Sequence, residues 1–294
     1  MVALVIVAAS AVAVIAATPA AFRDPVPIAG GRFEASGVTH VPGSEQLLFV
    51  DDGRNRDVFV LELDADGRQV GSAVGVTLGA DVTDLEGITS DGRHFYVVGS
   101  QSKKGGVAGD GLVRFRYDPS TRRIAGVERV RGLKALLETG VAELRGRRGD
   151  LALNIEGLAW DPRGGRLLLG LRAPVVDGKA LIVALTLVDP DGAFSSSNLR
   201  VDGTVMKLDL GGAGIRGLEY DDRAKSFRVI AGGSSDRDNR DFQLREWDGV
   251  AASEPRVLRS FDARLKPEGI AAATIGGRPV SVLVFDVGRF EIVR

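Results

Sequence analysis

The feature that most constrains the fold of this chain is a short motif that occurs five times. In each copy a glycine is followed by a branched apolar residue, and in four copies a charged residue precedes the glycine. The copies are Ser36-Gly37-Val38, Glu86-Gly87-Ile88, Glu156-Gly157-Leu158, Arg216-Gly217-Leu218 and Glu268-Gly269-Ile270. A short strand, a tight turn and a second apolar strand follow each glycine, as in Asp91-Gly92 before Phe95–Val98. Hairpins that recur every 50 to 70 residues are typical of the four-stranded blades of a β-propeller.

The five copies predict an all-β protein, a β-propeller with five blades. Six blades stay an alternative, because about 45 residues per blade are common. Two unrelated β-sandwiches would not explain five copies of one hairpin motif. Only 25 residues follow Gly269, enough for about three strands. We therefore expect the stretch Pro25–Ala35 to supply the missing strand and to close the ring, which removes exposed sheet edges.

The longest interval between two copies contains a pattern with a different period. It spans the 70 residues from Gly87 to Gly157. Leucine and valine residues recur there at near-helical spacing from Leu133 to Leu144. This pattern predicts one helical insertion between two blades, over residues 133–144.

The first residues are unlike the rest of the chain. Val2–Ala17 is an apolar run interrupted only by Ser10, and Thr18-Pro19-Ala20-Ala21 follows it. This pattern predicts a signal peptide over residues 1–21 and a periplasmic or secreted protein. Because no Lys or Arg precedes the run, a retained N-terminal membrane anchor is the alternative. Residues 22–294 are expected to form a single β-propeller domain.

Composition excludes several classes of function. With 38 Lys and Arg against 39 Asp and Glu, the formal net charge of -1 gives no electrostatic basis for binding nucleic acid. The absence of cysteine excludes thiolate zinc sites, iron–sulfur clusters and thiol catalysis, and two histidines are few for a zinc centre. We expect a monomer that contacts no membrane except through the N-terminal anchor, if that anchor is retained.

Three sets of segments carry a resemblance to a known family. They are Asn154–Ala159 with Arg166–Arg172, Leu208–Leu218, and Asp84–Ile88 with Val98–Ser102. These segments resemble the signatures of an uncharacterised bacterial family, domain of unknown function 3616, which implies a propeller-like fold and no established activity. The Leu-Glu-Gly-Ile motif is more remotely similar to esterase-like phytase propellers. Similarity to the Glu-Gly-Pro motif of calcium-dependent sugar lactonases is weaker, since no copy has proline after the glycine.

The repeat also predicts where polar side chains meet. The charged residue of each motif stands at the start of the first strand, and the antiparallel second strand ends on the same face. The ring should therefore gather two sets of polar groups at one mouth of its axial channel, one from the starts of the first strands and one from the ends of the second strands. The second set includes Ser234–Asp236. The candidate ligand-binding residues are Glu86, Glu156, Arg216 and Glu268 from the first set and Asp52, Ser100, Arg172 and Asp286 from the second. His40 and His94 are expected at the opposite mouth, which argues against a catalytic histidine.

Three roles are open to these residues. Carboxylates that converge near an axis suit a hard cation such as Ca²⁺, for which Glu86, Glu156 and Glu268 are the candidate metal ligands. Arg172 and Arg216 could instead hold a phosphate or a carboxylate. Each Glu could also tie neighbouring blades together by accepting backbone N–H groups, which is a structural role.

We therefore expect an exported β-propeller that binds a small ligand or a partner protein at the axial mouth. Whether it is an enzyme stays open. In a Ca²⁺-assisted phosphoester or ester hydrolase, as the phytase resemblance implies, Glu86 or Glu156 would activate water. A sugar lactonase with one bound cation is a further alternative. Only Lys103 and Lys104 lie near the mouth, fewer lysines than a phytase-like site would carry.

Overall fold

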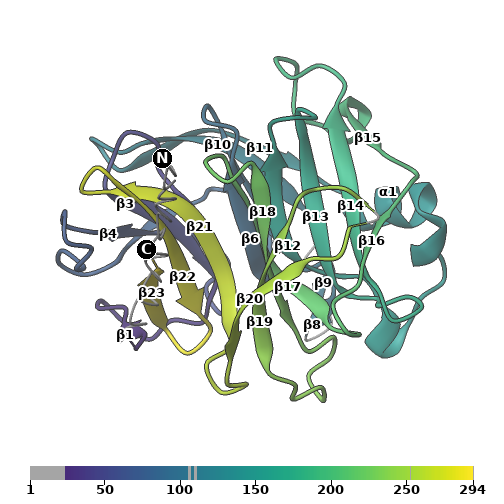
Figure 1. Cartoon of the computed structure of the whole chain (residues 1–294). Helices are drawn as coiled ribbons and strands as arrows, with labels where there is room; N and C mark the ends of the chain where they lie inside the picture. Colours follow the sequence, from purple (N-terminus) through teal and green to yellow (C-terminus); the bar gives the residue numbers. More distant parts are fainter. Residues whose placement is uncertain (1–23, 105–106, 109–110, 252, 294) are drawn as a thin grey trace, which may run out of the picture.

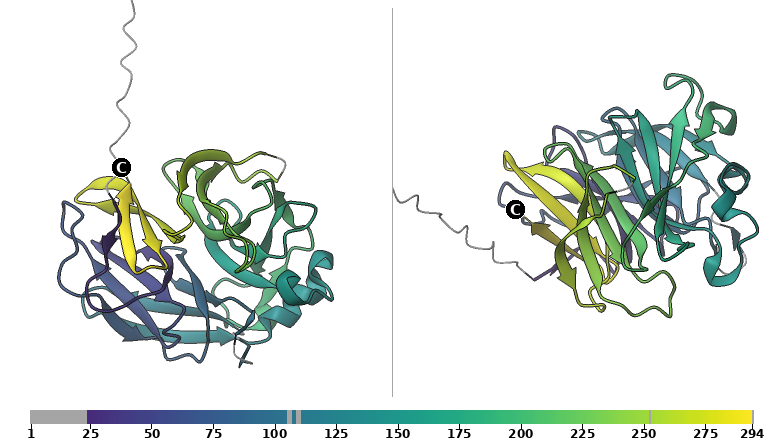
Figure 2. Two further views of the ribbon diagram at one scale, coloured as in Figure 1. Left: turned by 90° about the horizontal axis from the view of Figure 1, so that it is seen from below. Right: turned by 45° about the vertical axis from the view of Figure 1, so that its right-hand side comes forward.

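Each copy of the glycine motif lies in the innermost strand of one blade of a five-bladed β-propeller (Figure 1). The computed structural model describes residues 24–104, 107–108, 111–251 and 253–293. Seen from below, the blades follow one another in chain order around the centre (Figure 2, left). Strands make up 51% of the structure, so the predicted all-β propeller is confirmed. The described residues form five large sheets, which excludes the six-bladed alternative.

Four of the blades have four strands, and β14 in the third blade pairs with one strand more. The first blade contains β2 (Ala35–His40), β3 (Gln46–Asp51), β4 (Asp57–Glu62) and β5 (Val74–Thr77). The second contains β6 (Leu85–Ser90), β7 (Phe95–Gly99), β10 (Leu112–Asp118) and β11 (Arg123–Val130). The third contains β12 (Asn154–Asp161), β13 (Arg166–Ala173), β14 (Ala180–Leu187), β15 (Leu199–Val201) and β16 (Met206–Leu208).

The last two blades complete the ring. The fourth contains β17 (Gly214–Asp221), β18 (Ser226–Gly232), β19 (Phe242–Trp247) and β20 (Arg256–Phe261). The fifth contains β21 (Pro267–Ile275), β22 (Arg278–Phe285), β23 (Arg289–Val293) and β1 (Val26–Pro27). Outside the blades, β8 (Lys103–Lys104) and β9 (Val107–Ala108) pair with each other between β7 and β10.

The N-terminal strand β1 closes the ring by pairing with β23 at the edge of the fifth blade. This pairing is the expected closure, but it is shorter than predicted. Only Val26 and Pro27 are in the strand, and Ala35 already belongs to β2 of the first blade. Pro27 lacks an amide N–H, which suits the edge of a sheet and limits its ladder. Between the two strands, Ile28 and Phe33 are buried against residues of the first and fifth blades.

A β-bulge in each innermost strand displaces the residue that precedes the motif glycine. In β6, Leu85 pairs with Gly99 and Gly87 pairs with Val98, so Glu86 is the extra residue. The same shift in register occurs at the corresponding residues of the other four blades, which are Ser36, Glu156, Arg216 and Glu268. Because a bulge re-aims a side chain, the repeat sets these five positions apart from the regular ladder.

The motif glycines lie where neighbouring innermost strands approach one another around the axis. A Cβ atom on Gly217 would lie 2.6 Å from the carbonyl oxygen of Glu268, and one on Gly37 would lie 2.6 Å from that of Glu86. A side chain at either position would collide with the backbone of the next blade. Glycine is therefore required at these two positions for the blades to pack this closely.

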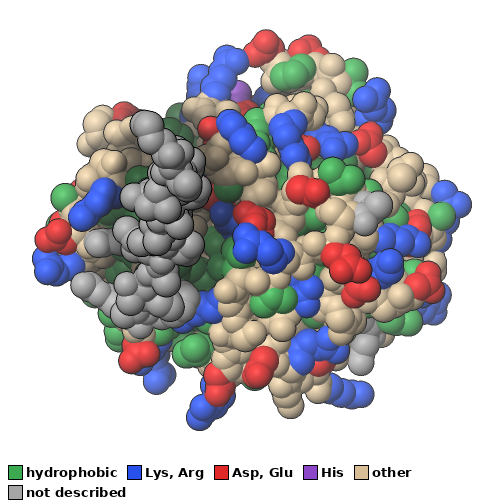
Figure 3. All heavy atoms as spheres, viewed as in Figure 1, with side chains coloured by type: hydrophobic (Ala, Val, Ile, Leu, Met, Phe, Trp, Pro, Cys, Tyr) green, Lys and Arg blue, Asp and Glu red, His purple; other side chains and the backbone are tan. Residues whose placement is uncertain are grey.

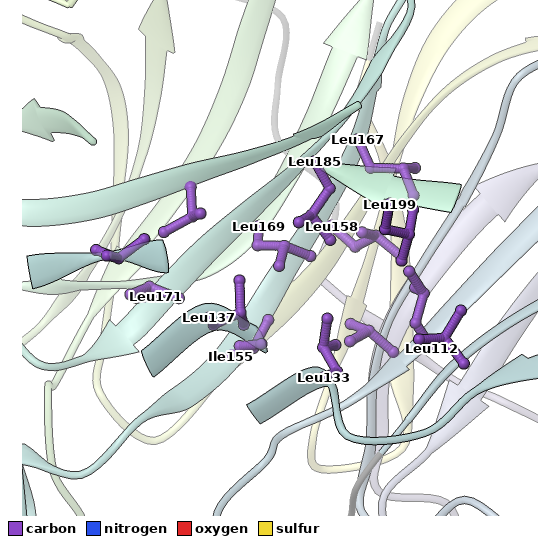
Figure 4. Close-up of a cluster of buried hydrophobic side chains, with 14 of the residues drawn as sticks. Leu112, Leu133, Leu137, Ile155, Leu158, Leu167, Leu169, Leu171, Leu185 and Leu199 are labelled. Atoms are coloured by element: carbon purple, nitrogen blue, oxygen red, sulfur yellow. The ribbon is translucent and has the colours of Figure 1, made fainter. Parts of the chain in front are cut away.

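The insertion between the second and third blades contains helix α1 (Leu133–Gly140) and the short helices η1 (Ala142–Leu144) and η2 (Gly149–Leu151). A fourth, η3 (Ser196–Asn198), precedes β15. The predicted helix over residues 133–144 is therefore divided, because Val141 has an extended backbone with φ -116° and ψ 117°. Gly140 and the β-branched Val141 both have low helix propensity. Leu133 and Leu137 pack with leucines of the second and third blades (Figure 4).

The apolar N-terminal segment, and with it the expected signal peptide over residues 1–21, lies outside the described residues. Within the part of the chain that is described, no helix is long and apolar enough to cross a membrane. On the face shown in Figure 3, basic and acidic side chains are interspersed.

Candidate functional site at the axial mouth

The axial mouth is a cavity of about 250 Å³ at the end of the propeller where the bulged residues lie. Seven of the eight predicted ligand-binding residues line it, which are Asp52, Glu86, Glu156, Arg172, Arg216, Glu268 and Asp286. The eighth, Ser100, is fully buried and donates a hydrogen bond to the carboxylate of Asp84. The structure thus brings together residues that lie up to 234 positions apart in the chain.

An ion-pair network occupies the centre of the mouth. Arg216 Nε lies 2.7 Å from Glu156 Oε2, and its Nη2 atom contacts Glu268 Oε1. Arg172 Nη1 donates to Glu156 Oε1 over 3.1 Å, and Arg172 Nη2 donates to Asp236 Oδ1 over 2.6 Å. Both arginines therefore already have two carboxylate partners each. A phosphate or carboxylate entering the centre of the mouth would have to displace them.

Glu86 lies in different surroundings from the other two glutamates. It is 5% exposed and lines the cavity, and its side chain forms no hydrogen bond or ion pair with another described residue, although the charge of Arg216 acts on it. Oxygen atoms of Asp52, Asp84 and Glu86 lie within 4.8 Å of one another. Of the three carboxylates that the sequence predicted as metal ligands, Glu156 and Glu268 pair with Arg216, whereas Glu86 belongs to this separate group. We call Asp52, Asp84 and Glu86 the carboxylate cluster.

Local contacts hold Asp84 in place. Its backbone has a positive φ of 57°, its N–H donates to Asn55 Oδ1 over 2.6 Å, and its carbonyl accepts the N–H of Ser100 over 2.9 Å. Its carboxylate accepts hydrogen bonds from the hydroxyls of Ser100 and Ser102. Ser100 thus contributes to the mouth by orienting Asp84 rather than by lining the cavity.

Burial and like charge raise the pKa values of several carboxyl groups at the mouth. Desolvation raises the pKa of Glu86 well above its ordinary value, and the negative charges of Glu156 and Glu268 raise it further. Desolvation raises the pKa of Glu268 to about 7, although Arg216 acts in the opposite direction. At the rim, a hydrogen bond with Asp52 raises the pKa of Glu34. The mouth therefore holds more carboxylates than its cations neutralise.

Four charged residues at the mouth were neither predicted site residues nor among the predicted strand ends, and these are Asp84, Asp238, Arg240 and Lys266. Asp84 stands two positions before Glu86, but it precedes β6 with a positive φ and Glu86 is the bulged residue, so the alternation of side chains along a strand does not point to it. The other three lie in connections whose path the hairpin repeat does not predict. Lys266 Nζ donates to Asp286 Oδ2 over 2.6 Å, which joins a residue that was predicted to one that was not.

The opposite mouth has a cavity of about 400 Å³ that is lined by His40 and Glu219, among others. His94 also lies at this end, where its ring is 3.4 Å from the carboxylate of Asp91. Both histidines thus lie away from the mouth that holds the bulged glutamates. Glu219 is a buried carboxylate at this end, and desolvation raises its pKa well above the ordinary value.

Part of the chain matches a family model. Residues 145–273 match the family model described as "Protein of unknown function (DUF3616)". The match includes Asn154–Arg172 and Leu208–Leu218, two of the three sets of segments that suggested this family. A comparison with curated protein sequences gives no significant match.

Two solved structures that this chain resembles are distant from it in sequence. The holo form of the PQQ domain of pyranose dehydrogenase from Coprinopsis cinerea is 12% identical with a TM-score of 0.52, and the alignment covers 93% of this chain and 96% of that one. An iodide structure from Trichoderma reesei, of Carbohydrate-Active Enzymes Family AA12, is 11% identical with a TM-score of 0.50. The alignment covers 95% of this chain and 100% of that one. These likenesses show the fold alone. The family match confirms the resemblance: residues 145–273 of this five-bladed propeller carry the signature of DUF3616, a family of unknown function.

Proposed function

We propose that this protein binds a small hydroxyl-rich molecule at its axial mouth, together with a Ca²⁺ ion held by the carboxylate cluster. The observation that carries the proposal is Glu86. It is 95% buried in the wall of the cavity, and its carboxylate forms no hydrogen bond or ion pair with another described residue. The charge of Arg216, which pairs with Glu156 and Glu268, lowers the pKa of Glu86 less than desolvation and the neighbouring carboxylates raise it. An ionised carboxylate buried in this way is costly unless a positive charge accompanies it.

The geometry of the cluster suits a calcium ion. Ca²⁺ takes oxygen ligands at about 2.3–2.6 Å, so two oxygens on one ion lie at most about 5 Å apart. The oxygens of Asp52, Asp84 and Glu86 meet this limit at 4.8 Å. Ca²⁺ also accepts irregular ligand sets and keeps positions for water or ligand hydroxyls, whereas Mg²⁺ requires a near-ideal octahedron.

The lining of the mouth favours a ligand rich in hydroxyl groups. Seven carboxylates and four basic side chains line the cavity, and Phe242 and Ala263 are the apolar side chains in that lining. Carboxylates accept hydrogen bonds from hydroxyls, and a bound Ca²⁺ can coordinate them. The paired state of Arg172 and Arg216 argues against an anion at the centre.

Calorimetric titration of chelator-treated protein with Ca²⁺ alone tests the proposal, with melting curves as a second readout. We expect Ca²⁺ to bind and stabilise the fold by about 2.7 kcal/mol at a hundredfold excess over Kd. For a domain of this size that corresponds to several degrees in Tm. Glu86→Gln and Asp52→Asn should each weaken binding at least about tenfold, since one charge-assisted ligand is lost.

Glu219→Gln is the matched control, because it changes another buried carboxylate on an innermost strand at the opposite mouth. This variant should bind Ca²⁺ as the parent does. No binding of Ca²⁺ by the parent at millimolar concentration, or unchanged binding by both cluster variants, would overturn the proposal. Stabilisation by phosphate instead, abolished in Arg216→Ala, would establish an anion site.

A second candidate is Ca²⁺-assisted hydrolysis of an ester or lactone. The observation that favours it is Glu268, which lines the same cavity and has a pKa raised to about 7, a value suited to a general base at neutral pH. The excess of carboxylates makes a neutral ester a better substrate than a phosphomonoester. Ca²⁺-dependent hydrolysis of p-nitrophenyl acetate or glucono-1,5-lactone that Glu268→Gln abolishes would support this reading.

We further propose that the protein acts outside the cytoplasm, on the basis of the apolar run Val2–Ala17. Expressed in a Gram-negative host, it should be recovered from the periplasm shortened by about 20 residues. A full-length product that sediments with membranes would show a retained anchor.

A further inference from the structure

A second cavity adjoins the axial mouth and has the opposite charge. It measures about 630 Å³ and lies between the insertion and the third and fourth blades. Lys134, Arg147 and Arg148 from the insertion line it, and we call it the basic cleft. Arg172, Ser235 and Asp236 line both cavities, so the two lie side by side.

We propose that the basic cleft binds an anionic group of the same ligand whose hydroxyl-rich part lies in the axial mouth. The ligand is then a sugar acid or a sugar phosphate. This inference rests on the proposed binding function of the mouth, because it assigns the other end of that ligand.

The charges of the basic cleft are available to a ligand. Arg147 Nε donates to the backbone carbonyl of Glu143 over 3.0 Å, a contact that orients the guanidinium without neutralising it. Lys134 Nζ donates to the carbonyl of Gln101 over 3.4 Å and lies 4.0 Å from Glu138. The guanidinium of Arg148 has no hydrogen bond or ion pair with another described residue, and its backbone carbonyl accepts the N–H of Leu151 over 3.2 Å. The one acidic side chain in the described lining, Asp236, already pairs with Arg172.

The insertion that provides these cations is not part of the repeated architecture. The ring closes through β1 and β23, and the innermost strands contact one another without the insertion. Its apolar face, including Leu133 and Leu137, packs on the second and third blades and fixes its position (Figure 4). The insertion therefore presents its basic residues from a fixed position beside the mouth.

The two cavities together define the chemistry of the ligand. A neutral polyol would leave the cations of the cleft without a partner, whereas a bare phosphate would find only paired arginines in the mouth. A molecule with hydroxyls at one end and a carboxylate or phosphate at the other satisfies both. Hydrogen bonds to a charged group contribute about 1.5–3 kcal/mol, so the anionic group should raise affinity at least about tenfold.

The test is calorimetric titration of the full mature protein with Ca²⁺ present, using D-glucose, D-glucuronate and glucose 6-phosphate as probes. The parent should bind one of the two anionic sugars at least about tenfold more tightly than glucose, and the choice between them identifies the anionic group. High salt should weaken that preference. The double variant Arg147→Ala/Arg148→Ala should lose it, and Arg147→Lys/Arg148→Lys should restore most of it.

Arg145→Ala is the matched control. Arg145 belongs to the same insertion and donates to the carbonyl of Thr139 over 2.9 Å, but it does not line the cleft. Its removal should leave the preference intact. Equal affinity for glucose and both anionic sugars, no binding of any probe, or an undiminished preference in the double alanine variant would overturn the inference. Binding of Ca²⁺ alone tests the proposed function separately. Failure of the proposed function can therefore be distinguished from failure of the inference about the basic cleft.

Discussion

At the scale of single residues, the two ends of the propeller each contain a buried carboxylate on an innermost strand. Glu86 lies at the axial mouth next to other acidic side chains, and Glu219 lies at the opposite mouth. Neither forms an ion pair among the described residues. Such groups make folding depend on pH, since the folded state favours their protonated form.

We predict that Glu219→Gln stabilises the protein above neutral pH. The pKa of Glu219 is raised mainly by desolvation and secondarily by Asp221, although backbone N–H groups of Ala272 and Tyr220 lower it. Because this pKa is higher in the folded state, the contribution of Glu219 to stability is fully present below about pH 4.5, its pKa in the unfolded chain. That contribution is lost as the pH rises toward the pKa of Glu219 in the folded state. The amide cannot ionise, so the variant should gain about 1–3 kcal/mol at pH 8.

Urea unfolding of parent and variant between pH 4 and pH 8 checks this prediction. The two should be similar in stability at pH 4 and diverge as the pH rises, with the variant more stable. A variant that is less stable than the parent at pH 8 would show that Glu219 is ionised and well compensated in the folded state.

At the scale of elements, one short motif performs two tasks in every blade. The bulge directs the residue before the glycine toward the mouth, and the glycine lets the innermost strand contact its neighbour. These tasks are linked, because the close approach of the strands brings Glu156, Arg216 and Glu268 within contact distance. A change at the glycine should therefore affect both the packing and the site.

We predict that Gly217→Ala destabilises the fold by about 2–3 kcal/mol, the usual cost of overpacking a tight contact. Its Cβ would lie 2.6 Å from the carbonyl oxygen of Glu268, whose strand would have to move. Gly203→Ala is the control, since its Cβ would meet no atom closer than 3.7 Å. Chemical denaturation of both variants is the measurement. Equal stability of the two would contradict this account of the repeat.

At the scale of the whole molecule, the ring is closed by a strand from the other end of the chain. β1 pairs with β23 over only two residues, but Ile28 and Phe33 are buried beside it at 3% and 6% exposure. The N-terminal segment therefore contributes both a ladder and apolar burial. Closure of a sheet into a ring protects the edges that would otherwise stay exposed.

We predict that a protein beginning at Glu34 unfolds at a markedly lower temperature than one beginning at Asp24. The shortened protein loses β1 and the burial of Phe33, and truncating a buried Phe alone costs about 3–5 kcal/mol. Phe33→Ala in the longer protein separates burial from closure. The deletion should cost more than this substitution. If the deletion and Phe33→Ala lower the stability equally, the two-residue strand β1 does not contribute to closing the ring.

The sequence alone determined the architecture, because the information for it is local and repeated. The motif glycines and hairpin turns predicted five blades, and the shortage of strands after Gly269 predicted closure by the N-terminus. The same repeat predicted seven of the residues that line the mouth, since antiparallel hairpins return to one face. The helical pattern was found as well, although its division at Val141 depends on a backbone angle that periodicity does not report.

Only the tertiary structure decided which of those charges meet. Arg216 lies between Glu156 and Glu268, whereas Glu86 lies with Asp52 and Asp84, and the repeat makes all three glutamates look equivalent. The difference arises from the side chains that neighbouring blades and irregular connections bring to each position. Distances between residues far apart in sequence determine burial, pairing and pKa, and a local pattern does not contain them. The mouth could therefore be predicted from the sequence, but its division into a paired centre, a carboxylate cluster and an adjoining basic cleft could not.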